Sequence, residues 1–271
     1  MRNSCYLLGA ITGDICGSSY ERSAGRTKEY DKVVLKRFDN SFTDDTVCTI
    51  GIANAILKYG NPTSEQFAEC LVEMCRKYPD RGYGSNFQKW IDNPVPYDSY
   101  GNGSAMRVSP VGFWSTSVDQ CLSLAANSAD CSHNHPEGIN GAQAIALSIF
   151  YAKKSDDKSL DSVRWVLDWK YPQWASKTLD EIRPDYTFKV SCQESVPVAI
   201  LAFLESSSYE DCIKKAISMG GDSDTLAAMA GGIAYAYYKE MPFSLSEYAA
   251  DLLTDDIEDT IIKFDEALMC R

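Results

Sequence analysis

The segment Met219-Gly220-Gly221-Asp222-Ser223-Asp224-Thr225 places two carboxylates, two residues apart, between a Gly-Gly pair and an apolar run of helical length. Side chains at i and i+2 point to different faces of a helix, so the two aspartates can meet only in a turn or at a helix N-terminus. The glycines allow the unusual backbone angles that such a turn requires. The segment therefore predicts a polar turn that opens a helix over residues 226–239.

The segment Thr43-Asp44-Asp45-Thr46 has the same arrangement, because an apolar run over residues 47–57 follows it directly. A single cluster of this kind is explained well enough as a helix N-cap whose acids complement the helix dipole. Helix capping does not explain two matched clusters with four carboxylates, because carboxylates that are held together repel one another unless a cation lies between them. Hard divalent cations prefer oxygen ligands, so the pair of clusters predicts a metal site.

The composition limits the classes of partner. The 271-residue chain has a formal net charge of −12 and a pI of about 4.7, which argues against non-specific binding to nucleic acid or to an anionic membrane. Its ten cysteines include no CxxC pair and are predicted to be reduced thiols. The apolar stretch at 6–11 is too short to span a bilayer. A cytoplasmic monomer without membrane association is expected.

Helical spacing of apolar residues recurs along the whole chain, no series of strands is apparent, and residues 1–271 are predicted to form one all-α domain. Gly9, Gly13 and Gly17, four residues apart, would let another helix approach closely. The tryptophan-rich stretch 165–174 is predicted to pack in the core, with a contact to an acceptor protein as the alternative. The predicted helices cover residues 5–19, 47–59, 64–78, 118–129, 141–153, 159–169, 194–205, 209–218, 226–239 and 245–268.

Residues 93–104 form the longest stretch without helical periodicity, and long irregular loops inside compact domains are often functional. Gly101 and Gly103 would let a ligand reach backbone N–H groups there, and Tyr97 or Tyr100 could stack on a base. A plain surface connector explains the same composition equally well.

Both histidines of the chain lie in Cys131-Ser132-His133-Asn134-His135. This set could bind zinc, but it lacks a fourth ligand at familiar spacing. A histidine that is hydrogen-bonded to a ligand or to the backbone is the favoured interpretation.

Four blocks, each a weak signal alone, follow one another along the chain: Gly9-Ala10-x-x-Gly13-Asp14-x-x-Gly17 followed by Glu21, Thr43-Asp44-Asp45-Thr46, Tyr100-Gly101-Asn102-Gly103-x-Ala105-Met106-Arg107, and Gly220-Gly221-Asp222-Ser223-Asp224-Thr225. In this order they resemble the ADP-ribosylglycohydrolase family. The resemblance implies a compact, orthogonal multi-helix fold with two Mg²⁺ ions in a central cleft, Mn²⁺ being an alternative ion. It also implies hydrolysis of the bond between ADP-ribose and an acceptor, in an ADP-ribosylated protein or a small ADP-ribosyl conjugate.

The resemblance also assigns roles to individual residues. Glu21, Asp44 and Asp45 would be catalytic, with Glu21 or a metal-bound aspartate as the base. This fits the chemistry, because a glycosidic bond breaks through an oxocarbenium-like state in which a carboxylate activates water or stabilises charge. The metal ligands would be Thr43, Asp44, Asp45, Asp222, Asp224 and Thr225. The residues that contact ADP-ribose would be Gly82, Gly84, Ser99, Tyr100, Gly101, Asn102 and His133.

Two other functions compete with this one. A non-catalytic reader would bind ADP-ribose without cutting it, although such a protein could dispense with the ligand positions that are all present here. The pair Asp222 and Asp224 also matches the nucleophile motif of haloacid-dehalogenase-type phosphatases, but that motif should follow a buried strand early in an α/β fold. The acceptor stays open, since variable loops build that side of a site.

Overall fold

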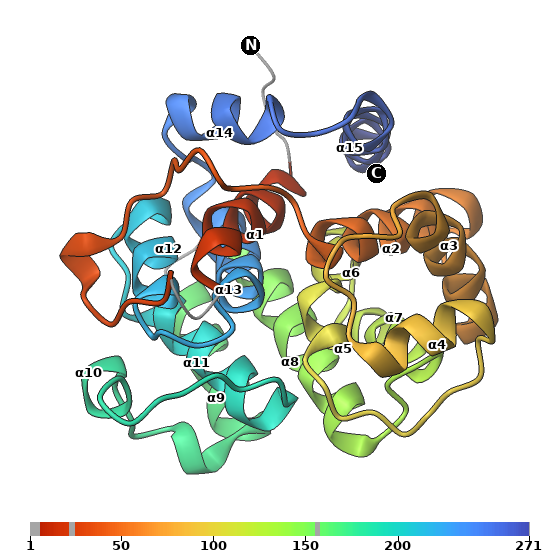
Figure 1. Ribbon diagram of the computed structural model, residues 1–271. Helices are drawn as coiled ribbons and strands as arrows, with labels where there is room; N and C mark the ends of the chain where they lie inside the picture. Colours follow the sequence, from red (N-terminus) through yellow and green to blue (C-terminus); the bar gives the residue numbers. More distant parts are fainter. Residues whose placement is uncertain (1–5, 22–24, 155–157, 271) are drawn as a thin grey trace.

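All regular elements of the computed structural model, which describes residues 6–21, 25–154 and 158–270, are helices (Figure 1). Within these residues, the one β-type contact is an isolated bridge between Gly101 and Ser191. The all-α prediction is therefore confirmed. The α-helices are α1 (Leu8–Glu21), α2 (Asp44–Tyr59), α3 (Ser64–Lys77), α4 (Ser85–Asp92), α5 (Gly103–Met106), α6 (Ser109–Trp114), α7 (Val118–Asp130), α8 (Pro136–Ala152), α9 (Ser159–Lys170), α10 (Leu179–Ile182), α11 (Cys192–Leu204), α12 (Tyr209–Ile217), α13 (Ser223–Tyr238), α14 (Phe243–Ala250) and α15 (Asp255–Met269); the short 3₁₀ turns are η1 (Tyr30–Lys32) and η2 (Pro172–Trp174).

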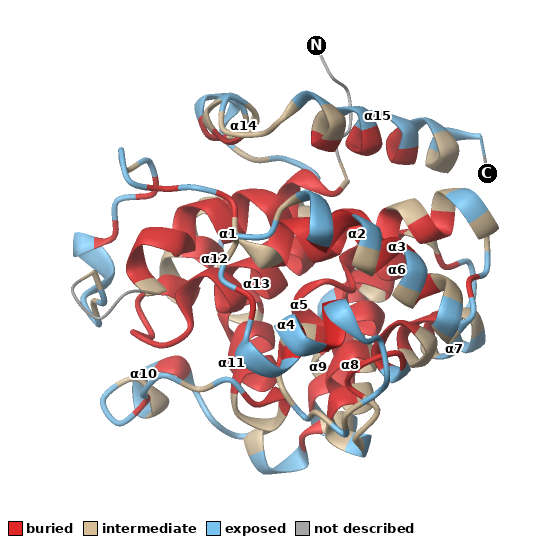
Figure 2. Ribbon diagram, turned by 45° about the vertical axis from the view of Figure 1, so that its right-hand side comes forward, coloured by how far each residue is buried: buried red, intermediate tan, exposed pale blue. Residues whose placement is uncertain are grey.

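Helices α1 and α13 lie against each other at the centre of the molecule, and both are buried along nearly their whole length (Figure 2). A Cβ atom added at Gly13 would lie 2.1 Å from the carbonyl oxygen of Ala227, and one at Gly17 would lie 2.4 Å from that of Ser223. The two backbones are thus in direct contact, as the glycine spacing predicted. The contact carries the polar residues of α1 to the N-terminus of α13.

The remaining helices pack around this pair. Helices α8, α11 and α12 cover α13, while α2 packs on α3, α6 and α15. The predicted start of α3 is confirmed, because Thr63 and Gln66 form a reciprocal capping box. No described helix has both the length and the apolar content needed to cross a membrane.

The predicted single helix over residues 245–268 is wrong, since two helices, α14 and α15, occupy this region. The acidic start of α15 is the cause: Asp255 and Asp256 lie in its first turn, where they complement the helix dipole. The Asp256 carboxylate also accepts hydrogen bonds from Tyr78 and Lys77, which fix α15 to the end of α3.

The prediction that the tryptophans of residues 165–174 lie in the core is wrong for Trp165 and Trp169, whereas Trp174 is partly buried against the core. Trp165 and Trp169 are 49% and 48% exposed, and their rings stack on the surface with centroids 5.1 Å apart. Helix α9 instead buries Val163, Val166 and Leu167, which occupy a different stripe of the same helix. Tyr171, which follows α9, is buried as expected.

Candidate active-site cleft

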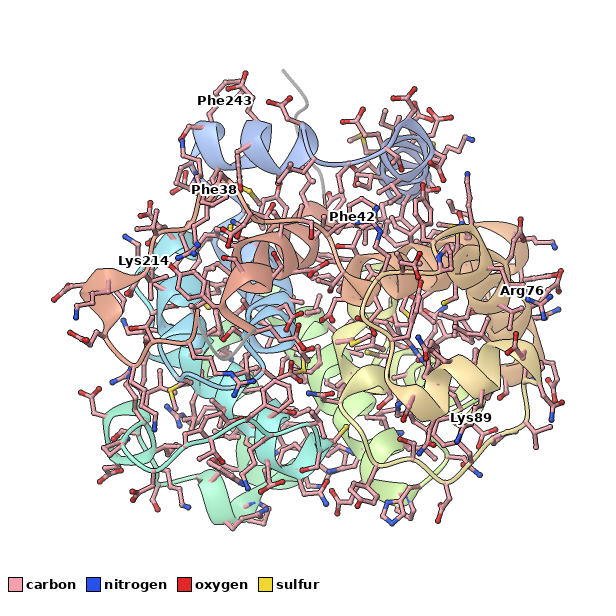
Figure 3. The ribbon with its side chains drawn as sticks, viewed as in Figure 1. Phe38, Phe42, Arg76, Lys89, Lys214 and Phe243 are labelled. Carbon is pink, nitrogen blue, oxygen red and sulfur yellow. The ribbon has the colours of Figure 1, made fainter. Side chains whose placement is uncertain are left out.

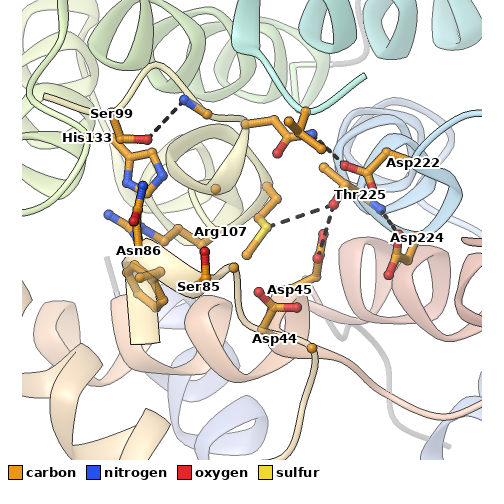
Figure 4. A pocket seen from close by; sticks show the side chains of 18 of the residues that line it. Asp44, Asp45, Ser85, Asn86, Ser99, Arg107, His133, Asp222, Asp224 and Thr225 are labelled. Atoms are coloured by element: carbon orange, nitrogen blue, oxygen red, sulfur yellow. Dashed lines mark hydrogen bonds between the residues drawn. The ribbon is translucent and has the colours of Figure 1, made fainter. Parts of the chain in front are cut away.

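The two acidic clusters meet between α1, α2 and α13 (Figure 4). Carboxylate oxygens of Asp14, Asp45 and Asp224 all lie within 4.8 Å of one another, and so do those of Glu21, Asp222 and Asp224. Asp224 therefore belongs to both groups. The side chains that the sequence pattern predicted to come together do so, and two acids of α1 join them.

The N-terminus of α2 is held by a residue far away in the sequence. Thr43 is the N-cap, and its Oγ1 accepts a hydrogen bond from the backbone N–H of Asp45. The same hydroxyl donates to Oδ1 of Asp14, at 2.7 Å, and the Thr46 hydroxyl donates to Oδ2 of Asp14. Asp14 thereby ties α1 to the first turn of α2.

The N-terminus of α13 follows a sharp turn in which Gly220 has a φ of +69°, a conformation that favours glycine. Asp222 is the N-cap, and its Oδ2 accepts a hydrogen bond of 2.8 Å from the Asn102 side-chain amide. Thr225 in the first turn donates from Oγ1 to Oδ2 of Asp45, at 3.2 Å. The two predicted clusters are therefore in direct contact.

Burial and mutual repulsion make these acids hard to ionise without a counter-charge. Burial raises the pKa of Asp14 and of Asp222 to about 6. The pKa values of Asp44, Asp45 and Asp224 are raised well above the ordinary range, because burial is reinforced by neighbouring carboxylates. Oδ1 of Asp45 is buried and has no hydrogen-bond partner among the described residues. An oxygen-rich set with an orphaned buried acceptor fits a hard divalent cation.

A cleft of about 430 Å³ extends from these carboxylates to a group of aromatic and basic side chains at its other end (Figure 4). The helix ends and loops around α4, α5 and residues 183–191 form its walls. Its lining residues are Glu21, Asp44, Asp45, Gly82, Gly84, Ser85, Asn86, Phe87, Tyr97, Ser99, Gly101, Asn102, Gly103, Met106, Arg107, His133, Phe188, Val190, Asp222, Asp224 and Thr225.

The far end of the cleft carries positive charge. The Arg107 side chain is fully buried; its Nη2 donates to the Ser128 carbonyl and to Oγ of Ser132, whereas Nε and Nη1 have no partner among the described residues. Helix α4 begins beside it with a glycine N-cap, and the first backbone N–H groups of a helix have no intrahelical acceptor. Other basic side chains, such as Arg76 and Lys89, are exposed on the outside of the molecule (Figure 3). This end of the cleft is suited to an anion.

His133 lies in the same region and is 5% exposed, with its Nδ1 2.8 Å from the Ser132 hydroxyl. Burial and the nearby Arg107 charge lower the pKa of His133 well below its usual value, so the ring is neutral near pH 7. A Cβ at Gly103 would lie 2.9 Å from its Nε2, so this glycine leaves room for the ring.

Most of the predicted site residues line the cleft, and the exceptions are Thr43 and Tyr100. Thr43 lies behind the lining, where it contacts Asp14 and Asp45. Tyr100 is 53% exposed and its ring meets His135 edge-on, with centroids 5.4 Å apart.

Sequence reasoning missed Arg107, Phe188 and Val190, all of which line the cleft. Arg107 closes the third sequence block and could have been singled out as a charge next to an apolar segment. Nothing in the local sequence marks Phe188 or Val190, which reach the cleft only because the loop before α11 crosses its edge.

The structure does not support the two alternative sites, a zinc site at residues 131–135 and a phosphatase motif at Asp222 and Asp224. Cys131, His133 and His135 are engaged separately: the Cys131 thiol donates to the Ser128 carbonyl, and Nδ1 of His135 accepts the N–H of Glu137 as the N-cap of α8. They form no candidate metal group among the described residues. The phosphatase motif requires a strand before Asp222, but helix α12 and a turn occupy that position.

Comparisons with known proteins agree on one family. A family model described as ADP-ribosylglycohydrolase matches residues 5–268. The chain is 29% identical to ADP-ribosylhydrolase ARH3 of Xenopus tropicalis, covering 89% of this chain and 88% of that protein. It is 27% identical to ADP-ribosylhydrolase ARH3 of Homo sapiens, covering 86% and 84%. It is 23% identical to ADP-ribosylarginine hydrolase Tri1 of Pseudomonas putida (strain GB-1), covering 86% and 69%.

A solved structure described as an ADP-ribosylglycohydrolase-related protein complex has the same fold. It superimposes with a TM-score of 0.72 at 18% identity, and the match covers 96% of this chain and 95% of that chain.

Proposed function

The chain belongs to the ADP-ribosylglycohydrolase family, and we propose that it is a Mg²⁺-dependent hydrolase that cleaves the glycosidic bond between ADP-ribose and an acceptor. The observation that carries the proposal is the polarity of the cleft. Two groups of carboxylates that share Asp224, all of them buried except the half-buried Glu21, lie at one end, and the buried Arg107 guanidinium and the start of α4 lie at the other. A ligand with a neutral sugar on one side of a diphosphate matches this arrangement.

The side chains proposed to hold two Mg²⁺ ions all offer hard oxygen atoms, the ligands that Mg²⁺ and Mn²⁺ prefer. Bound at this end of the cleft, the ions would polarise ribose hydroxyls and lower the pKa of water. The orphaned Oδ1 of Asp45 supports the assignment. The proposed ligands are Thr43, Asp44, Asp45, Asp222, Asp224 and Thr225.

Glu21 is proposed as the general base. It lines the cleft at the end of α1, and a carboxylate oxygen lies within 4.8 Å of those of Asp222 and Asp224. Its carboxylate would take a proton from the attacking water as the bond between the ribose and the acceptor breaks, and would pass this proton to the departing acceptor. Asp44 and Asp45 would stabilise the positive charge that develops on the sugar.

The opposite end is proposed to hold the diphosphate and the adenine. Arg107 and the first N–H groups of α4 would face the phosphates, next to Gly82 and Gly84. Tyr97 lines the cleft and lies with its ring centroid 5.8 Å from that of His133, so these rings would meet the base. Ser99, Gly101 and Asn102 would complete the contacts. Tyr100 would have to turn away from His135 to join them.

The acceptor is proposed to be linked through oxygen, as in a serine or threonine conjugate. Arg26 lies beside the carboxylate end: its Nε donates to the backbone carbonyl of Glu21, and its charge offsets a small part of the rise in the pKa of Asp222 that burial causes. Its guanidinium also stacks on Phe188, which lines the cleft. An arginine acceptor would bring a second positively charged guanidinium close to that of Arg26, whereas a hydroxyl-linked acceptor is neutral.

The proposal predicts release of free ADP-ribose from ADP-ribosylated peptides in the presence of Mg²⁺ but not of EDTA. A panel of serine-, threonine- and arginine-linked peptides tests it, and release should be faster from the oxygen-linked peptides. Binding of ADP-ribose without release from any conjugate would instead favour the non-catalytic reader. Equal release with Mg²⁺ and with EDTA would contradict the metal mechanism.

The raised carboxylate pKa values predict how pH changes the effect of Mg²⁺ on stability. Asp14 and Asp222 have a native pKa of about 6 against an ordinary value of 3.8, so the native protein holds protons that the unfolded chain has lost. In the metal-free protein, these groups therefore reduce stability as pH rises through this window. Mg²⁺ should raise the Tm strongly at about pH 7.5 and weakly at about pH 5, where protons compete with it.

Thermal denaturation with Mg²⁺ and with EDTA at both pH values measures this difference. The buried neutral His133 acts in the opposite direction, because its lowered pKa makes the protein less stable as pH falls. That contribution is the same with and without metal, so it cancels in the Mg²⁺-induced shift. An equal shift at the two pH values would contradict the prediction.

A further inference from the structure

Asp14 is a fully buried carboxylate in the middle of α1, the helix that packs most extensively against α13. It accepts four hydrogen bonds from two threonines at the start of α2. The Thr43 hydroxyl donates to Oδ1 at 2.7 Å; the backbone N–H groups of Thr43 and Thr46 donate to Oδ2 at 3.0 and 3.1 Å, and the Thr46 hydroxyl donates to Oδ2 at 2.5 Å.

Proximity alone would make Asp14 a further cation ligand, because one of its oxygens lies within 4.8 Å of those of Asp45 and Asp224. The hydrogen bonds argue otherwise. An ionised carboxylate has about four lone-pair sites, two on each oxygen. Oδ2 of Asp14 receives three donors, so both of its lone pairs are in use, whereas Oδ1 receives only the Thr43 hydroxyl. All four donors belong to the start of α2. Asp14 is therefore placed to hold other residues in position.

The contact with Thr43 has a specific chemical consequence. A hydroxyl group has one proton and two lone pairs, and only a lone pair can bind a cation. The Thr43 proton is directed to Asp14, at 2.7 Å, in preference to Asp45, at 3.4 Å. One lone pair of Oγ1 accepts the N–H of Asp45, which leaves the other available. Beside it, Oδ1 of Asp45 is buried without a partner.

We propose that Asp14 is the positioning residue of the cation site: it draws the Thr43 proton away from the site, turns a lone pair of the threonine oxygen toward the cation, and fixes the first turn of α2, which carries Asp44 and Asp45. The inference rests on the proposed function for the presence of a cation. It assigns Asp14 no contact with substrate or metal. Partners of this kind that orient metal ligands typically change metal affinity when they are replaced.

Asp14→Asn tests the proposal, because an amide has the same shape but cannot accept all four hydrogen bonds. If the amide nitrogen takes the place of Oδ2, it faces two backbone N–H groups; if it takes the place of Oδ1, it donates to Thr43 and turns the threonine proton toward the cation. We expect the Kd for Mg²⁺, measured by calorimetry without substrate, to rise by about 10- to 100-fold. The unfolding transition in EDTA should stay cooperative.

Thr12→Val is the matched control. Thr12 has a buried hydroxyl on the same helix; it donates to the Met241 sulfur, and neither residue lines the cleft. This variant should keep the Mg²⁺ affinity of the unmodified protein within about twofold. A Kd for Asp14→Asn within the same twofold range would overturn the proposal.

A second pair of variants decides the matter if Asp14→Asn does not fold. Thr46→Val removes one donor to Asp14 and Thr46→Ser keeps it, and neither changes a proposed ligand. Weaker Mg²⁺ binding in the valine variant alone would support the proposal, and equal binding in both would overturn it. Absence of Mg²⁺ binding by the unmodified protein would instead overturn the metal part of the proposed function, and this inference with it.

Discussion

Replacement of Asp224 with asparagine is expected to remove a proposed ligand that lies among both groups of acids, to weaken binding of the proposed Mg²⁺ ions, and to lower the rate of ADP-ribose release by on the order of 10³-fold, since metal ions contribute several kcal/mol of transition-state stabilisation. Asp224 is the one carboxylate that belongs to both groups of acids among the described residues. It lies in the first turn of α13, 4% exposed, between Asp222 and the Asp45 of α2. Asparagine keeps the shape of the side chain and removes its charge.

The stability of this variant separates loss of metal from loss of fold. The pKa of Asp224 is raised well above its ordinary value by burial and by the charges of Asp222 and Asp45. Its ionised form therefore destabilises the metal-free native state near pH 7. In EDTA, Asp224→Asn should be at least as stable as the unmodified protein, whereas the rise in Tm on addition of Mg²⁺ should be nearly abolished.

Asp119→Asn is a suitable control, because Asp119 is an exposed acid in the first turn of α7, outside the cleft. It should leave both activity and the Mg²⁺-induced shift unchanged. A normal Mg²⁺ shift in Asp224→Asn, with activity within about tenfold, would show that the two carboxylate groups do not share this residue functionally.

The acidic clusters could be predicted from the sequence because each is a local pattern. Carboxylates and hydroxyls stand directly before an apolar run. Helices α2 and α13 begin at Asp44 and Ser223, three residues before the predicted starts at 47 and 226, so the acidic residues Asp44, Asp45 and Asp224 lie in their first turns. The repulsion between the carboxylates of two such clusters is also a chemical reason to expect a bound cation. What the pattern could not supply was the helix that brings them together.

That helix is α1, and its part in the site depends on tertiary packing. The spacing of Gly9, Gly13 and Gly17 indicated a close helix contact but not the identity of the partner. Once α13 is the partner, Asp14 falls beside the start of α2, although its apolar surroundings in the sequence suggest an ordinary helix interior. Asp14 could therefore be noted from the sequence, but not placed.

The prediction that Trp165 and Trp169 are buried was wrong for a related reason. Trp165 and Trp169 are four residues apart and so share one face of α9, and large aromatic residues are usually buried. Val163, Val166 and Leu167 form a competing apolar stripe on the same helix, and this stripe is the one that faces α8 and α11. Periodicity shows that α9 has two apolar stripes, but only packing determines which of them is buried.

The substitution Gly13→Ala is expected to destabilise the protein by about 3 kcal/mol, at the upper end of what overpacking usually costs. The new Cβ would lie 2.1 Å from the carbonyl oxygen of Ala227 and 2.5 Å from its carbonyl carbon. Backbone atoms cannot rotate away, so α1 would have to move away from α13. The gain in helix propensity from glycine to alanine is about 1 kcal/mol and cannot offset this.

For a chain of this size, the expected loss corresponds to a fall in Tm of roughly 5–10 °C. Gly84→Ala is the control for stability alone, because a Cβ at Gly84 would meet nothing within 4 Å. Separation of α1 from α13 would also move Asp14 and Glu21 away from Asp222 and Asp224, so Mg²⁺ affinity should fall together with stability. A variant with reduced stability but normal Mg²⁺ affinity would mean that the close helix contact supports the fold without setting the spacing of the carboxylates.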